Sequence, residues 1–407
     1  MKSENISSAI NEIDELFIES ANEIRKPKAK KSPWLKYAAT AAVIALVVFA
    51  GINALTPNST TPEGNNDFPL NSNGDTEYGA NLPKLVFEQS GATAYGFEGY
   101  LAYDISELEN GNPWNENMAL KTLPVYRNNS YNEAGIAYPG IGEEAMLKKL
   151  DSVTNGEHGE IEYSHIGDFS EGTGIPDDFI DSIKVISGNH EIEIQSNGGI
   201  VVTYSFDGEE LPDDISFTYT ETSEGDAYKA ISYICQNYCD FIDKANTTFV
   251  TSGEYTFDGE FSRDYRIYDF SGDEISDMLN FAFSEVQLAP NDEGKLMLIR
   301  VNDKLSCAEK IGDYPIISVE EATALLTEGS YITTVPYEIP GEKYIARVEL
   351  IYRSSIGENI WMPYYRFLVE LPEMAQENGL KEFGAFYVPA VEMEYLSGLP
   401  LWNGSFN

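Results

Sequence analysis

The sequence predicts an α+β fold: a single transmembrane helix followed by an extracytoplasmic region of antiparallel meander sheets covered by helices. One segment is long and apolar enough to cross a bilayer, and the chain after it alternates strand-like and helix-like patterns without a regular βαβ repeat. The 407 residues are 42% apolar, which is enough for two or three compact cores. A formal net charge of −41 argues against nucleic acid as a partner, because binding phosphate needs a basic surface.

The predicted transmembrane helix covers residues 37–55, a run of nineteen residues without a charged side chain. At about 1.5 Å per residue it is roughly 28 Å long, close to the ~30 Å hydrocarbon core of a bilayer. Six basic residues and no acidic one lie between Arg25 and Lys36, so the positive-inside rule places the N-terminus in the cytoplasm and residues 56–407 outside the cell membrane. A cleaved signal peptide is the alternative, although such peptides rarely carry about 36 residues before their apolar part.

Composition sets the remaining domain boundaries. Residues 1–25 are expected to form a cytoplasmic amphipathic helix, and residues 26–36 a basic juxtamembrane segment. Residues 56–83 contain four prolines, three glycines and six asparagines with few apolar side chains, which is typical of a flexible linker. Beyond it we expect two extracytoplasmic α+β subdomains, residues 84–223 and 224–407.

The cytoplasmic helix has one apolar face. Its apolar residues recur every three or four positions and are Ile6, Ile10, Ile13, Phe17, Ala21 and Ile24. A helix of about 20 residues is marginal in water, so this face needs something to cover it. The bilayer surface is disfavoured, because the polar face is acidic and anionic lipid would repel it. We therefore expect a protein partner, with a second copy of the helix or a loosely ordered tail as the alternatives.

The N-terminal pattern carries a resemblance. The stretch from Ala9 to Ala21, the basic segment, Trp34 and one span together resemble the N-terminus of many single-pass membrane proteins of clostridial Gram-positive bacteria. Some of these resemble membrane-bound partners of extracytoplasmic-function sigma factors, in which the cytoplasmic helix holds the factor. The resemblance implies a sigma factor-like partner for residues 1–25. The zinc-binding His/Cys motif of many anti-sigma domains is absent from this sequence.

The outer region resembles a family of uncharacterised clostridial membrane proteins. The stretches that carry this resemblance are residues 99–108, 112–114, 123–126, 312–318, 362–367 and 387–392. The family brings no assigned function.

Periodicity places the secondary structure of the outer region. Strands are expected at 95–104, 184–195, 199–206, 214–220, 296–302, 344–352, 361–371 and 383–395, and helices at 142–153, 224–244, 273–285 and 318–328. In 344–352 the apolar side chains alternate with Arg347 and Glu349, which predicts a half-buried antiparallel strand. Asp207-Gly208, Asp258-Gly259 and Ser271-Gly272 each follow an aromatic strand end and predict turns, the Asp-Gly pairs being a hairpin signal.

Motifs for catalysis are missing, so we predict that the protein is not an enzyme and has no cofactor. The sequence contains no phosphate-binding loop, no nucleophile elbow and no His-Glu-x-x-His, and it has only three histidines. The best metal candidate is His158, Glu160 and Glu162, which share one face if the segment is extended. A solvated acidic surface is the preferred interpretation of that segment, and no metal site is predicted.

Two other groups of residues support hypotheses, one about thiol pairing and one about ligand binding. Cys235 and Cys239 lie four apart on the expected helix 224–244, where buried thiols are more plausible than a bridge, while a bridge from Cys307 to one of them stays open. Trp361, Tyr364 and Tyr365 form the candidate ligand surface, because aromatic rings stack on sugars and anchor peptides.

The leading interpretation of the whole chain is a membrane-anchored extracytoplasmic regulator or sensor with a partner-binding helix inside the cell. The alternative is a cell-envelope module that binds a ligand or glycan and is anchored by an uncleaved signal-type helix. The first depends on the apolar stripe of residues 1–25, the second on the aromatic side chains of the outer region.

Overall fold

The computed structural model describes residues 82–88, 97–132, 135–205, 207–243 and 245–402, all within one compact unit. No helix among these residues is both long and apolar enough to cross a bilayer. The expected cytoplasmic helix, basic segment and span lie outside the described residues. So do the expected partner-binding residues Ile6, Ile10, Ile13, Phe17 and Ile24.

The described region consists of antiparallel sheets with four α-helices, so the expected α+β class is confirmed. The helices are α3 (Glu143–Thr154), α4 (Glu224–Tyr238), α5 (Glu274–Phe283) and α6 (Val319–Thr327). Each begins within one residue of its expected start, and α4 ends six residues before the expected end, because the backbone of Cys239 leaves the helical region.

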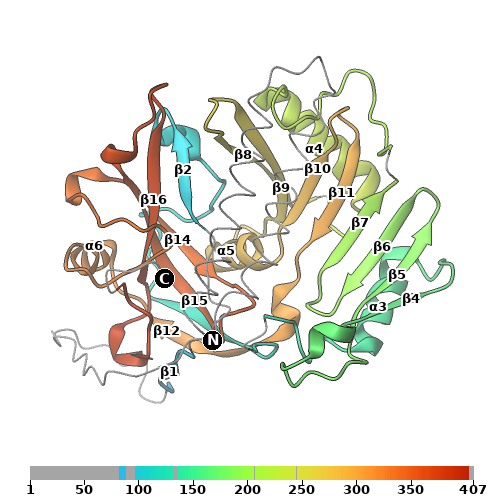
Figure 1. Ribbon diagram of the computed structural model, residues 1–407, viewed down its shortest axis with the longest axis horizontal. Coiled ribbons are helices and arrows are strands. Elements are labelled where there is room, and N and C mark those ends of the chain that lie inside the picture. The colour runs from blue at the N-terminus through green and yellow to red at the C-terminus, as the bar shows by residue number, and fades with distance from the viewer. Residues whose placement is uncertain (1–81, 89–96, 133–134, 206, 244, 403–407) are drawn as a thin grey trace, which may run out of the picture. The chain divides into compact units, whose positions relative to one another are not determined.

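The first large sheet has eight strands in the order β4-β5-β6-β7-β11-β10-β9-β8 (Figure 1). Its strands are β4 (Glu162–His165), β5 (Ile180–Ser187), β6 (His190–Gln195), β7 (Ile200–Tyr204), β8 (Thr247–Tyr255), β9 (Phe261–Asp269), β10 (Val286–Pro290) and β11 (Leu296–Val301). Two four-stranded meanders are thus joined edge to edge through β7 and β11.

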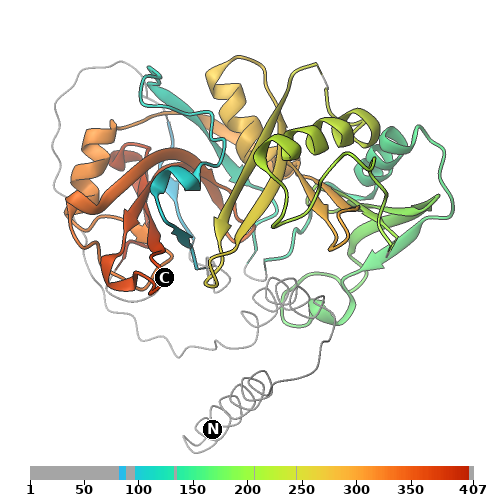
Figure 2. The ribbon, with the colours of Figure 1, turned by 90° about the horizontal axis from the view of Figure 1, so that it is seen from above.

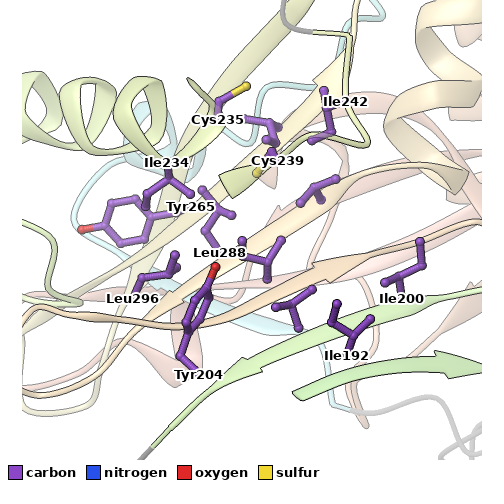
Figure 3. Close-up of a cluster of buried hydrophobic side chains, with 14 of the residues drawn as sticks. Ile192, Ile200, Tyr204, Ile234, Cys235, Cys239, Ile242, Tyr265, Leu288 and Leu296 are labelled. Atoms are coloured by element: carbon purple, nitrogen blue, oxygen red, sulfur yellow. The ribbon is translucent and has the colours of Figure 1, made fainter. Parts of the chain in front are cut away.

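One face of the eight-stranded sheet is apolar and is covered by α3 and α4 (Figure 2). Ser223 caps α4 by accepting a hydrogen bond from the backbone N–H of Asp226, and buried apolar residues at helical spacing face the strands. Figure 3 shows Ile234 and Cys239 of this layer above Tyr265 and Leu288 of the sheet. The opposite face of the sheet carries charged side chains.

The second large sheet has seven strands, ordered β12-β3-β15-β16-β13, with β14 paired to β15 and β2 paired to β16. Its strands are β2 (Gly99–Ala102), β3 (Thr122–Asn128), β12 (Ala308–Pro315), β13 (Ile332–Thr333), β14 (Ile345–Arg353), β15 (Ile360–Glu370) and β16 (Lys381–Pro389). A separate parallel pair joins β1 (Leu85–Val86) to β17 (Leu396–Ser397). Apolar clusters lie on both faces of β15 and β16, which explains their nearly continuous apolar sequence.

The large sheets meet where β2 lies against β8, and two further elements contact both of them. Helix α5 contacts both β9 and β14, and it lies between the sheets in Figure 1. Asp273 caps its first turn, and the buried carboxylate of Asp277 accepts hydrogen bonds from the turn that precedes it. The other element is the connector segment, residues 104–114, which runs from β2 towards β3 and contacts both sheets.

The sheets do not follow the expected division of the chain. The sequence analysis expects a subdomain boundary between residues 223 and 224. Each of the two large sheets contains strands from before and after this boundary. The pairings responsible, β7 with β11 and β3 with β12, join residues far apart in the chain. Local periodicity carries no information on such pairings. The fold also begins before residue 84, because Tyr314 donates a hydrogen bond to the carbonyl oxygen of Pro83.

Some expected strands differ from those observed. Residues 214–220 contain no strand, and 184–195 covers parts of two strands, β5 and β6, separated by a turn at Gly188-Asn189 with a positive φ of 64° at the glycine. The strands that lie outside the expected ranges are β1, β3, β4, β8, β9, β10, β12, β13 and β17. Of the three expected turns, Asp258-Gly259 does close a hairpin, whereas Ser271-Gly272 leads into α5.

Candidate functional site

The expected ligand surface is wrong, because its three side chains are buried. Trp361, Tyr364 and Tyr365 are each at most 4% exposed. The Trp361 ring stacks on Phe283 with centroids 5.8 Å apart, and its indole N–H donates to the carbonyl oxygen of Ser355. Tyr364 and Tyr365 point to opposite faces of β15, so they belong to two different cores. These aromatic residues stabilise the sheet and do not form an exposed surface.

The other sequence candidates are also placed by the structure. His158 lies against the Asp151 side chain and the Gly159 carbonyl, and only Glu162 of its expected partners belongs to β4. Among the described residues no group of His, Cys, Asp and Glu side chains is arranged to hold a metal ion. Cys235 and Cys239 lie in the core under α4, while the Cys307 thiol contacts the carbonyl oxygen of Ser196.

Charged side chains from both sheets converge where the sheets meet. We call this group the intersheet cluster; its members are Tyr100, Asn110, Glu254, Asp264, Arg266, Arg347, Glu349 and Arg366. The cluster joins β2, β14 and β15 of one sheet to β8 and β9 of the other, with the connector segment between them.

The centre of the cluster is a buried ion pair between neighbouring strands. Arg366 of β15 lies opposite Glu349 of β14 and opposite Tyr387 of β16 in the sheet register. Its Nε lies 2.9 Å from a Glu349 carboxylate oxygen, and a second guanidinium N–H donates to the same oxygen. Burial would lower the pKa of Arg366, but Glu349, together with Tyr387 and Tyr100, raises that pKa above its usual value. Arg366 therefore stays protonated.

The same strands hold the connector segment. Arg347 donates hydrogen bonds of 2.8 Å and 2.7 Å to the carbonyl oxygens of Leu108 and Ile105. The Asn110 side-chain amide donates to both oxygens of Glu349, each at 3.3 Å. The seven-stranded sheet thus fixes the connector through one half-buried cation, Arg347, and one buried anion, Glu349.

The eight-stranded sheet holds the connector from its other side. Arg266 of β9 donates to the carbonyl oxygen of Asn110 at 3.3 Å and to the Ser252 hydroxyl at 2.8 Å, and it pairs with Glu285 at 3.1 Å. Gly111 has a positive φ of 72°, and a Cβ built there would lie 2.6 Å from the methyl groups of Val250. The connector backbone is therefore packed directly against β8.

Two carboxylates complete the cluster on the eight-stranded side. Ser252 is opposite Asp264 in the hairpin register, and Glu254 follows one pleat further towards the hairpin end. Both side chains are exposed, and the protein around them raises the pKa of both by partial desolvation. The charge of Asp264 adds to the effect on Glu254, whereas for Asp264 the charge of Arg266 opposes the rise and that of Glu285 adds to it. Burial raises the pKa of Tyr100 to about 12, with Glu254 among the charges acting on it.

The intersheet cluster can bind and orient a charged group, and it can respond to a change of charge. The charges of Glu254, Glu349 and Arg366 act on Tyr100 across the contact, and those of Arg266 and Glu285 act on Asp264. The sequence analysis had noted Arg347 and Glu349 on the polar face of their strand. One signal was missed: Arg347 and Glu349 lie on a strand that is followed in the chain by an almost entirely apolar strand. Charged side chains in such surroundings are buried only if they are paired.

Comparison of the chain with protein-family models and with curated proteins finds no significant match.

We predict that removing the Glu349 charge destabilises the protein strongly, because Arg366 would stay buried without its counter-ion. Glu349→Gln is expected to lower the free energy of unfolding by about 3–5 kcal/mol. Urea unfolding of the full chain in detergent, followed by circular dichroism, measures this change.

The matched control is Glu309→Gln, which breaks the exposed ion pair between Arg127 and Glu309 and is expected to cost less than about 1 kcal/mol. The double variant Glu349→Leu/Arg366→Met, which removes both buried charges, is expected to regain most of the lost stability. Equal losses for Glu349→Gln and Glu309→Gln would show that the buried pair is not important for the fold.

Proposed function

We propose that the protein is a membrane-anchored regulator, in which an outer two-sheet domain senses a condition outside the cell and residues 1–25 bind a cytoplasmic protein. The proposal makes residues 37–55 the membrane anchor and the described region the extracytoplasmic part. It assigns no catalytic step and no cofactor to this chain.

The observation that carries the proposal is the polar part of the contact between the sheets. Each sheet has its own apolar core, and a small apolar cluster around Phe283 of α5 packs on Tyr352 and Trp361 of the seven-stranded sheet. Beside that cluster, Arg266, Arg347 and Glu349 hold the connector backbone by hydrogen bonds. Polar interfaces between parts of one chain allow relative movement more readily than apolar ones do. A contact of this kind is suited to a domain that changes between two arrangements when a ligand or ion shifts their balance.

The sequence of residues 6–24 supports a protein as the cytoplasmic partner. The apolar stripe of residues 6–24 has an acidic polar face, so a protein groove is a better match than an anionic lipid surface. The resemblance of residues 9–21 to membrane-bound sigma-factor partners supports a sigma factor-like protein as that partner.

We predict that Ile13→Asp abolishes capture of the cytoplasmic partner by the full chain. A carboxylate buried in an apolar groove costs roughly 2 kcal/mol or more, which weakens binding about thirtyfold or more. Crosslinking in intact membranes followed by mass spectrometry measures capture. Glu12→Gln, on the polar side of the same turn, is the matched control and should capture the partner as the unmodified chain does. Recovery of no sigma factor, or equal recovery with both variants, would count against the regulator.

A second candidate function is binding of an envelope glycan, supported by exposed aromatic residues that the sequence analysis did not select. Tyr103 and Phe257 are 42% and 70% exposed. They lie together at the end of the β8–β9 hairpin, where Tyr103 packs edge-on against Tyr255 and the Asn378 amide donates to the carbonyl oxygen of Phe257. Exposed rings beside amide and carboxylate groups are typical of sugar-binding surfaces.

If this second function is correct, Phe257→Ala should weaken binding of the full chain to purified cell-wall polysaccharide about fivefold or more, since a stacking aromatic contributes roughly 1 kcal/mol or more. A sedimentation binding assay measures the change. Ile186→Ala is the control, because Ile186 is equally exposed but belongs to a different hairpin. Failure of the unmodified chain to bind any wall polymer would eliminate this alternative.

A further inference from the structure

A buried carboxylate oxygen without a hydrogen-bond partner lies between β2 and β16, which are neighbours in the seven-stranded sheet (Figure 1). It belongs to Glu382, which is 4% exposed and lies opposite Leu101 in the register of the two strands. The oxygen is Oε1, and it accepts no hydrogen bond. A buried carboxylate in this state is costly, so it needs either a proton or a positively charged group beside it.

The surroundings of Glu382 supply no such charge. Gly384, on the same face of β16, packs against apolar side chains, of which Leu371 is one. Lys381, the preceding residue, points to the opposite face of the strand and pairs with Glu370 at 3.0 Å. Burial raises the pKa of Glu382, and no charge in the described part of the chain offsets that rise.

An exposed aromatic ring lies beside the buried oxygen. Phe97, just before β2, is 53% exposed. A Cβ built on Gly99 would lie 2.5 Å from an edge carbon of the Phe97 ring and 2.7 Å from Oε1 of Glu382. The ring and the carboxylate therefore converge on the place where Gly99 has no side chain. A ligand that arrives from solvent can contact both groups there.

We propose that Glu382 and Phe97 bind the alkylammonium group of a small organic cation. An ammonium group supplies both things that Oε1 lacks, a positive charge and an N–H donor, and an aromatic ring attracts a cation beside it. A metal ion is a poorer match, because the described residues contain no group of His, Cys, Asp and Glu side chains arranged to hold one. The use of this ligand as the signal of the regulator rests on the proposed function, whereas the binding does not.

The proposal sets an order among cations. A quaternary ammonium ion carries the charge but has no N–H, so it leaves Oε1 without a donor. A sodium ion has neither an N–H nor a hydrocarbon part that packs on the ring. Butylammonium should therefore bind more tightly than tetramethylammonium or sodium.

Thermal unfolding of the full chain in detergent micelles tests this order, because a ligand that binds only the folded state raises the unfolding midpoint. The chloride salts of the three cations are titrated at equal ionic strength and at about pH 8, well above the usual pKa of a Glu side chain. At about ten times its dissociation constant, butylammonium should raise the midpoint by roughly 2–4 °C. The other two cations should raise it by clearly less at the same concentration.

Four variants decide the assignment. Glu382→Gln removes the charge at nearly constant shape and Phe97→Ala removes the ring, so each should lose most of the response to butylammonium. The matched controls are Glu373→Gln, an exposed carboxylate between β15 and β16, and Phe270→Ala, an exposed ring outside the seven-stranded sheet. Both controls should respond as the unmodified chain does.

Stabilisation of the unmodified chain by sodium as strong as that by butylammonium would overturn the proposal, and so would a normal response in Glu382→Gln. The absence of any response would show that a proton alone neutralises Glu382. Without ligand, Glu382→Gln should be at least as stable as the unmodified chain, since it removes an unpaired buried charge; a clear loss of stability would show that the carboxylate already has a partner. The assay contains no cytoplasmic protein, so the binding and the proposed function fail separately.

Discussion

The structure depends on how the connector segment is held between the two sheets. Arg347 and Glu349 bind its carbonyl and amide groups from one side, and Arg266 binds it from the other. The connector also packs Ile105, Leu108 and Trp114 against the apolar clusters of the seven-stranded sheet, so apolar contacts and hydrogen bonds to charged groups fix its place together. Such bonds are stronger than neutral ones and need accurate geometry.

The fold shows which parts of a structure local sequence patterns can reveal. The four helices can be predicted because each carries its own periodic apolar stripe. In the structure, the side chains of Ser223, Asp273 and Ser318 cap three of them. Strands β14, β15 and β16 were predicted because alternation or a long apolar run identifies them. The pairing of β7 with β11, which joins two meanders into one sheet, could not be predicted, since it depends on residues about a hundred positions apart.

The candidate site was harder to predict for a related reason. An aromatic run such as Trp361, Tyr364 and Tyr365 has the same composition whether it forms a binding surface or a core, and only burial decides between them. In the sequence, charged residues such as Arg347 and Glu349 indicate a strand face in contact with solvent. In the structure, that face lies at the contact with the second sheet. The exposed aromatic residues Tyr103 and Phe257 stand alone in the sequence and come together only through the hairpin and the connector.

The central claim is that the connector carries the mechanical link between the sheets. Hydrogen–deuterium exchange of the full chain, comparing Arg347→Met with the unmodified protein, tests it most directly. The account predicts faster exchange in the connector and also in the β8–β9 hairpin of the other sheet, with no change in α3 and β6, which lie far from the contact. Faster exchange confined to β14 and its neighbours in the seven-stranded sheet would contradict it.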